Sequence, residues 1–302
     1  MSGTALSRDL LADTTRRARR FLDETGRRPC LAAVLVGGDP ASFAHVNMTR
    51  SRCIMVGIEA RVETLAETAT TGDVVSKIKE LSKDPLVDGI LVQNPLPAHV
   101  DERTVFEAID PHKDVDGVTT HSFARMAFGL PGPVSCTAEG IIRLLDHYEV
   151  ELTGAHAVVI GRTSMLGKPV GMLLLARNAT VTYCHSQSRD LAEIVRNGDI
   201  VVAATGRPGL VQGSWLKFGA VVIDAGYNTE TVGDVEFDEA KAVASLLTPV
   251  PGGVGPVTIA VLLHQTIETA ERRMAGPGNR KKSRTSATSK SPGRQTGKHV
   301  DT

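Results

Sequence analysis

Short apolar runs that alternate with helical patterns constrain this fold more than any other sequence feature. LAAVLV (31–36), VDGILVQ (87–93) and AVVI (157–160) are continuous apolar runs, and segments with helical periodicity lie between them. Strands that are buried on both faces show no polar alternation, and strands joined through helices run parallel. The sequence therefore predicts an α/β protein built from βαβ units, with parallel sheets covered by helices.

The same patterns give approximate bounds for the individual elements. Gly26 ends the opening helix, as glycine commonly does. The passage 110–140 is rich in loop residues and separates two α/β halves. The expected helices are 7–24, 41–53, 73–81, 138–147 and 256–273, and the expected strands are 31–36, 60–64, 87–93, 157–160, 179–186, 198–205 and 219–226.

Composition narrows the class of protein. With 302 residues, 41% of them apolar and 23% charged, the chain is long enough for two soluble domains. No apolar run approaches the roughly 18 residues of a membrane span, and the N-terminus lacks the pattern of a secretory signal. The four cysteines show no metal-ligand spacing, so we expect no metal site and a reducing, cytoplasmic setting. They are Cys30, Cys53, Cys136 and Cys184.

Charge is distributed unevenly along the chain. The formal net charge is zero, yet the segment 276–302 carries a cluster of lysines and arginines against Asp301 alone. The preceding body is therefore mildly acidic, which gives no case for nucleic-acid binding. The basic segment is also rich in Gly, Pro and Ser and has no apolar face, so we expect a solvated, disordered tail rather than a nucleic-acid arm.

A glycine turn after the strand 157–160 is the first candidate for a ligand site. Gly161 ends the strand and Gly167 opens the next helix, an arrangement that directs backbone N–H groups at a phosphate. The spacing differs from G-x-G-x-x-G, so a tight βα turn without a ligand remains an alternative. Arg162 and Ser186 favour the 2′-phosphate of NADP, because NAD usually requires an acid after the second strand.

Several longer motifs occur in order and carry a family resemblance. They are DPAS, VDGILVQNPLP, KDVDG, GRTSMLGKP, ATVTYCHS and TPVPGGVGPVT. With them the chain resembles the bifunctional methylenetetrahydrofolate dehydrogenase/methenyltetrahydrofolate cyclohydrolase family from about residue 5 to 272. The resemblance implies a folate-binding α/β domain, a Rossmann-type NADP domain, tetrahydrofolate derivatives held between them and a cytoplasmic homodimer. The implied bounds are 1–137 together with the returning helix 256–273, then 138–255, with 276–302 as the tail.

The resemblance also implies site residues. The cofactor contacts fall on Gly161, Arg162, Thr163, Ser186 and Tyr227. The substrate contacts fall on His45, Gln93, Asp116, Pro251, Gly252, Gly253, Gly255 and Pro256, and the catalytic positions are His45, Thr49, Gln93 and Asp116. Asp116 stands where the family's aspartate grips the pterin, whose amino-pyrimidine edge donates N–H groups to a carboxylate.

The helix ASFAHVNMTRSRC (41–53) departs from the family pattern. After DPAS the family carries a tyrosine and, four residues later, a lysine that is central to hydrolysis, whereas this chain has His45 and Thr49. PCTP has become SCTA (135–138), and Ser122 and Ala124 also differ. Hydride transfer needs positioning, but opening the methenyl ring needs a proton donor and acceptor. We therefore expect NADP-dependent dehydrogenase activity in one-carbon metabolism and purine biosynthesis, with cyclohydrolase activity weak or lost.

Two alternatives remain open at this point. Imidazole titrates near neutral pH, so His45 could take over the acid–base role and leave the protein bifunctional, or its flat ring could simply stack on the substrate. The remodelled helix could also belong to a non-catalytic protein that binds a folate or a nucleotide. The retained glycine turn and TPVPGGVGP motif count against this second alternative.

Overall fold

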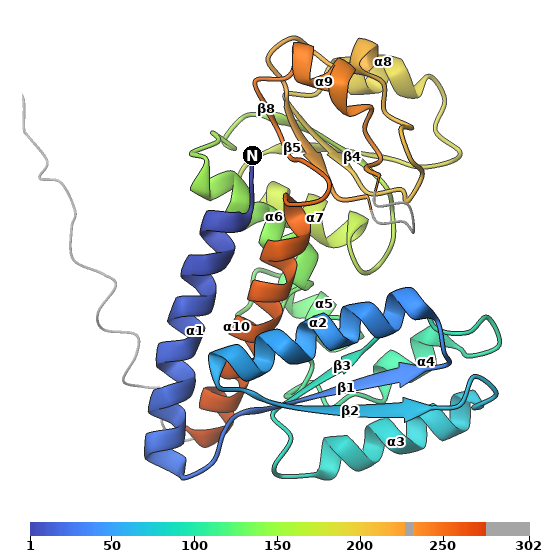
Figure 1. Cartoon of the computed structure of the whole chain (residues 1–302). Helices are drawn as coiled ribbons and strands as arrows, with labels where there is room; N and C mark the ends of the chain where they lie inside the picture. Colours follow the sequence, from blue (N-terminus) through green and yellow to red (C-terminus); the bar gives the residue numbers. More distant parts are fainter. Residues whose placement is uncertain (227–231, 276–302) are drawn as a thin grey trace, which may run out of the picture.

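The computed structural model describes residues 1–226 and 232–275, which form two α/β parts stacked along a pair of long helices (Figure 1). One part contains a three-stranded sheet of order β2-β1-β3, and the other a five-stranded sheet of order β5-β4-β6-β7-β8. All pairings between these strands are parallel. The predicted two-domain α/β fold with parallel sheets is confirmed.

The three-stranded sheet is covered on both faces, as its apolar strands require. Its central strand β1 (Cys30–Val36) is buried throughout and pairs with β2 (Glu59–Leu65) and β3 (Gly89–Val92). Leu31, Ala33 and Leu35 share a core cluster with residues of α2 (Pro40–Val56). The alternate residues of β1 pack against the opposite layer, which consists of α3 (Thr71–Lys83) and α4 (Glu102–Glu107).

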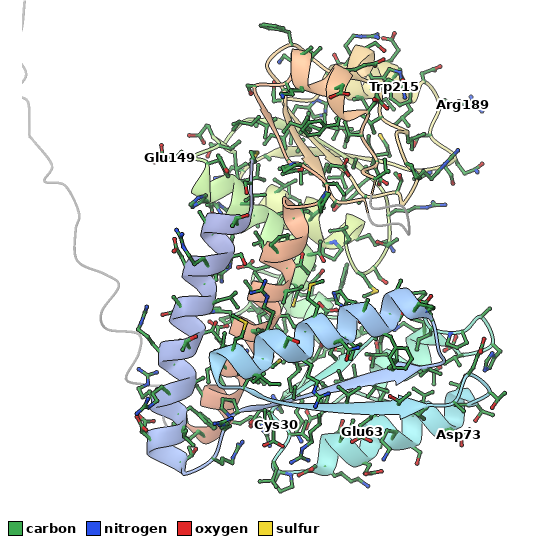
Figure 2. The ribbon with its side chains drawn as sticks, in the orientation of Figure 1. Cys30, Glu63, Asp73, Glu149, Arg189 and Trp215 are labelled. Atoms are coloured by element: carbon green, nitrogen blue, oxygen red, sulfur yellow. The ribbon has the colours of Figure 1, made fainter. Side chains whose placement is uncertain are left out.

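The five-stranded sheet is also sandwiched between helices. Residues of α6 and α7 share a core cluster with one face of the sheet, and α8, η1 and α9 cover the other. Trp215 lies in that outer layer, beside α8 and away from the first part (Figure 2). The elements are β4 (His156–Ile160), β5 (Thr180–Cys184), β6 (Ile200–Ala203), β7 (Val221–Asp224), β8 (Leu246–Leu247), α6 (Cys136–His147), α7 (Gly167–Ala176), α8 (Leu191–Arg196), η1 (Gly213–Trp215) and α9 (Phe237–Val243).

The two long helices α1 (Thr4–Thr25) and α10 (Val254–Met274) lie side by side and join the two parts (Figure 1). Apolar residues of both helices enter the same core cluster as one face of β1. Arg17 of α1 pairs with Glu271 of α10 at 2.6 Å. Arg27 and Arg273 reach the fully buried Asp88 at 2.7 and 2.9 Å, which fixes the end of α10 against the first sheet. The domain bounds given above stay a prediction.

One expectation about secondary structure was wrong. The loop-rich passage 110–140 was expected to hold no helix before residue 138, but it contains the helix α5 (Thr120–Ala127). Thr119 caps this helix by accepting a hydrogen bond from the Ser122 backbone N–H at 3.1 Å. The helix is only eight residues long, too short for its apolar spacing to stand out in the sequence. Within 1–226 and 232–275, no helix is long and apolar enough to cross a membrane. The tail 276–302 lies outside the described residues.

Candidate functional site

Helix α2 carries His45 and Thr49 on its border with the protein interior. Asp39 caps the helix by accepting a hydrogen bond from the Ser42 backbone N–H at 2.8 Å, and Pro40 occupies the first turn. The buried residues recur at helical spacing, and Thr49 is one of them, with 2% of its surface exposed. His45 lies one turn earlier and is half-buried.

His45 contacts Gln93, which follows β3. The imidazole Nδ1 lies 2.9 Å from Gln93 Oε1, and Gln93 Nε2 donates to the Asn94 carbonyl at 2.6 Å. Because the amide nitrogen is used on a carbonyl, Oε1 must act as the acceptor, so His45 carries a proton on Nδ1. In the neutral ring Nε2 is then left as an acceptor, and it has no hydrogen-bond partner in the described part of the chain.

Two buried polar atoms in this region have no partner among the described residues: Thr49 Oγ1 and Asn94 Oδ1. Buried polar atoms normally form hydrogen bonds, and those that do not commonly meet a ligand or water. Both belong to the elements that carry the His45–Gln93 contact. Unpartnered buried polar atoms on both α2 and the segment after β3 are consistent with a polar ligand or a water between them.

Asp116 lies in the KDVDG motif and faces the start of α6. Its Oδ1 accepts a hydrogen bond from the Cys136 backbone N–H at 3.2 Å. Burial raises the pKa of Asp116 to about 6; the bond from Cys136 opposes this shift, and the nearby Asp114 adds to it. A half-buried carboxylate with so few donors gains most from a ligand that offers N–H groups.

Gln265 on α10 organises the backbone around Asp116. Its Nε2 donates to the carbonyls of Val134 and Val115 at 2.7 and 3.2 Å, and its Oε1 accepts from the Val134 N–H at 2.9 Å. Only 5% of its surface is exposed. The sequence analysis missed this residue, although a glutamine inside the apolar closing helix was a usable signal.

The loop before α10 is shaped by glycines. A Cβ on Gly253 would lie 2.6 Å from the Pro249 carbonyl oxygen, and Gly252 has a φ of +104°. The Gly252 carbonyl accepts a hydrogen bond from the Gly3 N–H at 2.9 Å, which fixes the loop against α1. Gly255 faces open space, so its backbone is accessible to a ligand. Pro251 is exposed and Pro256 is half-buried in the first turn of α10.

The turn after β4 fits a dinucleotide phosphate. A Cβ on Gly161 would lie 2.3 Å from the Ala204 carbonyl oxygen, and one on Gly167 would lie 2.3 Å from the Gly161 carbonyl oxygen. Only glycines allow this close approach, which brings the N-terminus of α7 to the end of β4. Thr163 Oγ1 accepts bonds from the backbone N–H groups of Leu166 and Gly167 at 3.3 and 3.4 Å.

Arg162 and Ser186 are exposed at the ends of the neighbouring strands β4 and β5. Neither side chain has a hydrogen bond or an ion pair within the described part of the chain. Both are therefore free to meet an anionic group, and the residues fit a 2′-phosphorylated dinucleotide. Tyr227, also expected at the cofactor, lies outside the described residues.

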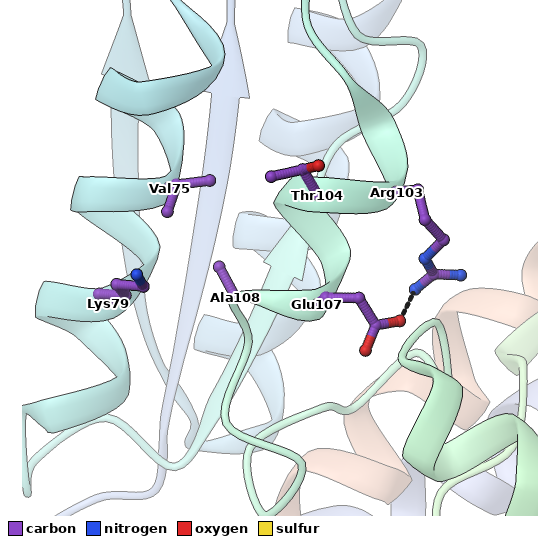
Figure 3. Close-up of a pocket in the computed structure, with 6 residues that line it drawn as sticks. All are labelled: Val75, Lys79, Arg103, Thr104, Glu107 and Ala108. Carbon is purple, nitrogen blue, oxygen red and sulfur yellow. Dashed lines mark ion pairs between the residues drawn. The ribbon is translucent and has the colours of Figure 1, made fainter.

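A separate surface hollow of about 300 Å³ lies between α3 and α4 (Figure 3). Arg103 and Glu107 form an ion pair of 2.5 Å there, and Arg103 also donates to the Val118 carbonyl at 2.7 Å. Arg103 and Glu107 therefore satisfy each other, and the hollow lies on the face of the sheet opposite α2. The residues that line it are Val75, Lys79, Arg103, Thr104, Glu107 and Ala108.

Comparisons with known proteins identify the family. Residues 1–116 match the catalytic domain of tetrahydrofolate dehydrogenase/cyclohydrolase, and residues 135–274 match the NAD(P)-binding domain of the same family. The chain belongs to this family. The NAD(P)-binding match confirms the expected dinucleotide cofactor.

Individual members of the tetrahydrofolate dehydrogenase/cyclohydrolase family align along nearly their whole length. The bifunctional protein FolD 1 of Streptomyces avermitilis is 57% identical over 274 residues, which cover 91% of this chain and 96% of the relative. The crystal structure of FolD from Campylobacter jejuni has a TM-score of 0.86 at 39% identity and covers 90% of this chain and 98% of its own. The Trypanosoma brucei enzyme, solved with NADP cofactor and inhibitor, has a TM-score of 0.87 at 35% identity, with 91% and 97% covered.

Proposed function

We propose that this protein catalyses the NADP-dependent oxidation of 5,10-methylenetetrahydrofolate to 5,10-methenyltetrahydrofolate, with hydrolysis to 10-formyltetrahydrofolate weak or lost. Family membership supports the folate chemistry and one-carbon metabolism. Supply of one-carbon units to purine biosynthesis is part of the proposal. The observation that carries the second half is Thr49. A buried hydroxyl, unpartnered within residues 1–226 and 232–275, stands where the family resemblance puts the hydrolytic lysine.

The residues are suited to hold two ligands for hydride transfer. NADP, when bound, accepts the hydride. Asp116 grips the pterin edge, Gln93 orients the one-carbon bridge, and the loop 248–256 contacts the folate through its backbone. Gly161, Arg162, Thr163 and Ser186 hold the dinucleotide. No proton moves in this step, so positioning and electrostatics suffice.

Hydrolysis makes a different demand on the same cleft. Water attacks the methenyl carbon and protons must be taken up and delivered as the ring opens, which requires a group with a tunable pKa. A threonine hydroxyl does not titrate in the useful range. Arg50 and Arg52 are exposed on the outer side of α2, and guanidinium stays charged.

Two substitutions at position 49 test the proposal. Thr49→Lys should introduce hydrolysis of methenyltetrahydrofolate, measured as loss of its absorbance above the buffer rate. Thr49→Val, which removes the hydroxyl and keeps the shape, should leave hydrolysis at the level of the unmodified protein. Rapid hydrolysis by the unmodified protein would contradict the proposal.

The His45–Gln93 contact supports a second candidate, a fully bifunctional enzyme. With Nδ1 directed at Gln93, the free Nε2 could accept and return a proton. His45→Phe separates this role from stacking, because phenylalanine keeps a flat ring and loses both ring nitrogens. If hydrolysis is present and falls in His45→Phe while dehydrogenation persists, His45 is the acid–base group; if both activities persist, its ring only stacks.

A non-catalytic folate- or nucleotide-binding protein is the remaining alternative. NADP binding without any reduction of the dinucleotide in the presence of methylenetetrahydrofolate would favour it. The glycine geometry of the turn 161–167 supports dinucleotide binding in both cases, so the reduction assay decides between them.

We also propose a cytoplasmic homodimer paired through the cofactor domain. The strand β5 lies at the edge of its sheet, and Tyr183 on it is 39% exposed. Leu175 of the adjacent α7 is 62% exposed. An open strand edge beside exposed apolar side chains is suited to pairing with a second copy. Light scattering during size-exclusion chromatography measures the mass directly, and a monomer would contradict this proposal.

A further inference from the structure

The cofactor turn reaches into the first domain through Met165. This side chain packs against the core cluster between the three-stranded sheet and helices α3 and α4. Asn94 Nδ2 lies 2.7 Å from the Met165 sulfur, and Asn94 directly follows Gln93. The turn that fits the dinucleotide is therefore seated on the segment that carries a predicted folate residue.

Ser135 makes a second contact to the same residue. It occupies the N-cap position of α6, where a serine hydroxyl usually bonds to the first turn of its own helix, but it makes no such bond. Its Oγ instead donates to the Met165 carbonyl. The side chain is 4% exposed, so the hydroxyl is committed to this contact. Serine here is one of the departures from the family's PCTP pattern, and proline could not donate this bond.

The next residue continues the connection to the folate side. The Cys136 N–H donates to Asp116 Oδ1 at 3.2 Å. Gln265 fixes the same stretch through the two carbonyls of Val134 and Val115. Direct contacts thus run from the cofactor turn through Ser135 and Cys136 to Asp116, without any intervening solvent-exposed group.

We propose that Ser135 is a positioning residue that couples NADP binding to folate binding. The proposal rests on the proposed function, because it assumes that the turn binds NADP and that Asp116 binds the pterin. A dinucleotide that orders the turn also orders Met165. Because the Ser135 hydroxyl is bonded to the Met165 carbonyl, the start of α6 becomes ordered as well. The Cys136 N–H there then holds Asp116 in place for the second ligand. A ligand that finds its site already ordered loses less conformational entropy on binding.

The test measures the affinity of tetrahydrofolate with and without NADP by calorimetry. Tetrahydrofolate lacks the transferable one-carbon group, so the two ligands bind without turnover. In the unmodified protein NADP should tighten tetrahydrofolate binding. Ser135→Ala should reduce that enhancement by about 3- to 10-fold, the effect of losing one net hydrogen bond. The Kd of NADP measured alone should change by less than about 2-fold, because no direct contact is removed.

Two matched variants separate coupling from general damage. Ser135→Thr keeps the hydroxyl and should retain the enhancement. Ser245→Ala removes a serine hydroxyl that donates to the Gly219 carbonyl at 2.7 Å, remote from both ligands, and should also retain it. An unchanged enhancement in Ser135→Ala, or an equal loss in Ser135→Thr, would overturn the proposal.

The same titrations separate a failure of this inference from a failure of the proposed function. Suppose that the unmodified protein binds both ligands and, given methylenetetrahydrofolate, reduces NADP to NADPH, while Ser135→Ala leaves the enhancement intact. Then only the coupling role of Ser135 is overturned. If tetrahydrofolate does not bind to the unmodified protein at all, both proposals are overturned.

Discussion

Individual side chains decide what the cleft can do, and Asp116 has the most specific environment among them. The motif KDVDG identified it in the sequence, but its raised pKa results from desolvation and from the nearby Asp114, which together outweigh the bond from Cys136. The His45–Gln93 contact could not be predicted either, because the two residues lie 48 positions apart on different elements. Sequence motifs identified these residue types, whereas their protonation and partners follow from packing.

Asp116 should give the reaction a defined pH dependence. The free protein's carboxyl has a pKa of about 6, so it is ionised above that pH and accepts the pterin N–H groups. Below it, kcat/KM for methylenetetrahydrofolate should fall about tenfold per pH unit. Asp116→Asn should lower kcat/KM by about 10- to 100-fold and abolish this limb. Asp9→Asn, on the exposed side of α1, serves as the control. A profile that keeps its limb in Asp116→Asn would assign the titration to another group.

The close packing at Gly161 allows a prediction about cofactor binding. An added Cβ would meet the Ala204 carbonyl oxygen at 2.3 Å, so Gly161→Ala must displace the turn. We expect NADP affinity, measured by calorimetry, to fall by at least about tenfold, since backbone N–H groups would leave the phosphate. Gly154 also has a positive φ, +77°, but nothing lies within 4 Å of its Cβ position. Gly154→Ala should therefore bind NADP normally, and equal losses in both variants would point to general destabilisation.

At the scale of elements, the long helices and buried strands followed from periodicity, whereas the short helix α5 did not. The expected helix 256–273 corresponds to α10, Val254–Met274, because its apolar spacing runs over several turns. The roles of the polar residues of α10 could not be predicted from this spacing. Gln265 supports the site, and Arg17, His264 and Glu268 cluster between α1 and α10. His264 and Glu268 are four residues apart on α10, but Arg17 and the partners of Gln265 come from distant parts of the chain, so the sequence pattern of α10 alone does not reveal these contacts.

The cluster of Arg17, His264 and Glu268 between α1 and α10 should make the stability of the fold depend on pH in the acid range. Burial alone would raise the pKa of Glu268, but His264, Arg17 and Arg272 outweigh it and lower the pKa to about 2. Because the folded value lies below the unfolded one, the carboxylate stabilises the fold above pH 4.5 and loses this effect as pH falls toward 2. Urea unfolding across this interval should show a shallower pH dependence in Glu268→Gln than in the exposed control Glu24→Gln. Identical slopes in the two variants would contradict this prediction.

At the scale of the whole molecule, the helices α1 and α10 lie side by side and hold the two α/β parts together (Figure 1). The described cores account for this arrangement without the segment 276–302. Truncation after Ala275 should therefore leave dehydrogenase kcat and KM within about 2-fold, as expected for changes remote from packed or ligand-binding groups. A large loss of activity on truncation would show that the basic tail takes part in binding or catalysis.

The most direct measurement follows NADPH and methenyltetrahydrofolate together during oxidation by the unmodified protein. A cleft that aligns the folate with nicotinamide but lacks the ammonium group should release its product unhydrolysed. We predict that methenyltetrahydrofolate accumulates in equal amount to NADPH until the slower buffer hydrolysis removes it. NADPH formation without accumulation of the methenyl product would show efficient hydrolysis in the same site and contradict the assigned role of Thr49.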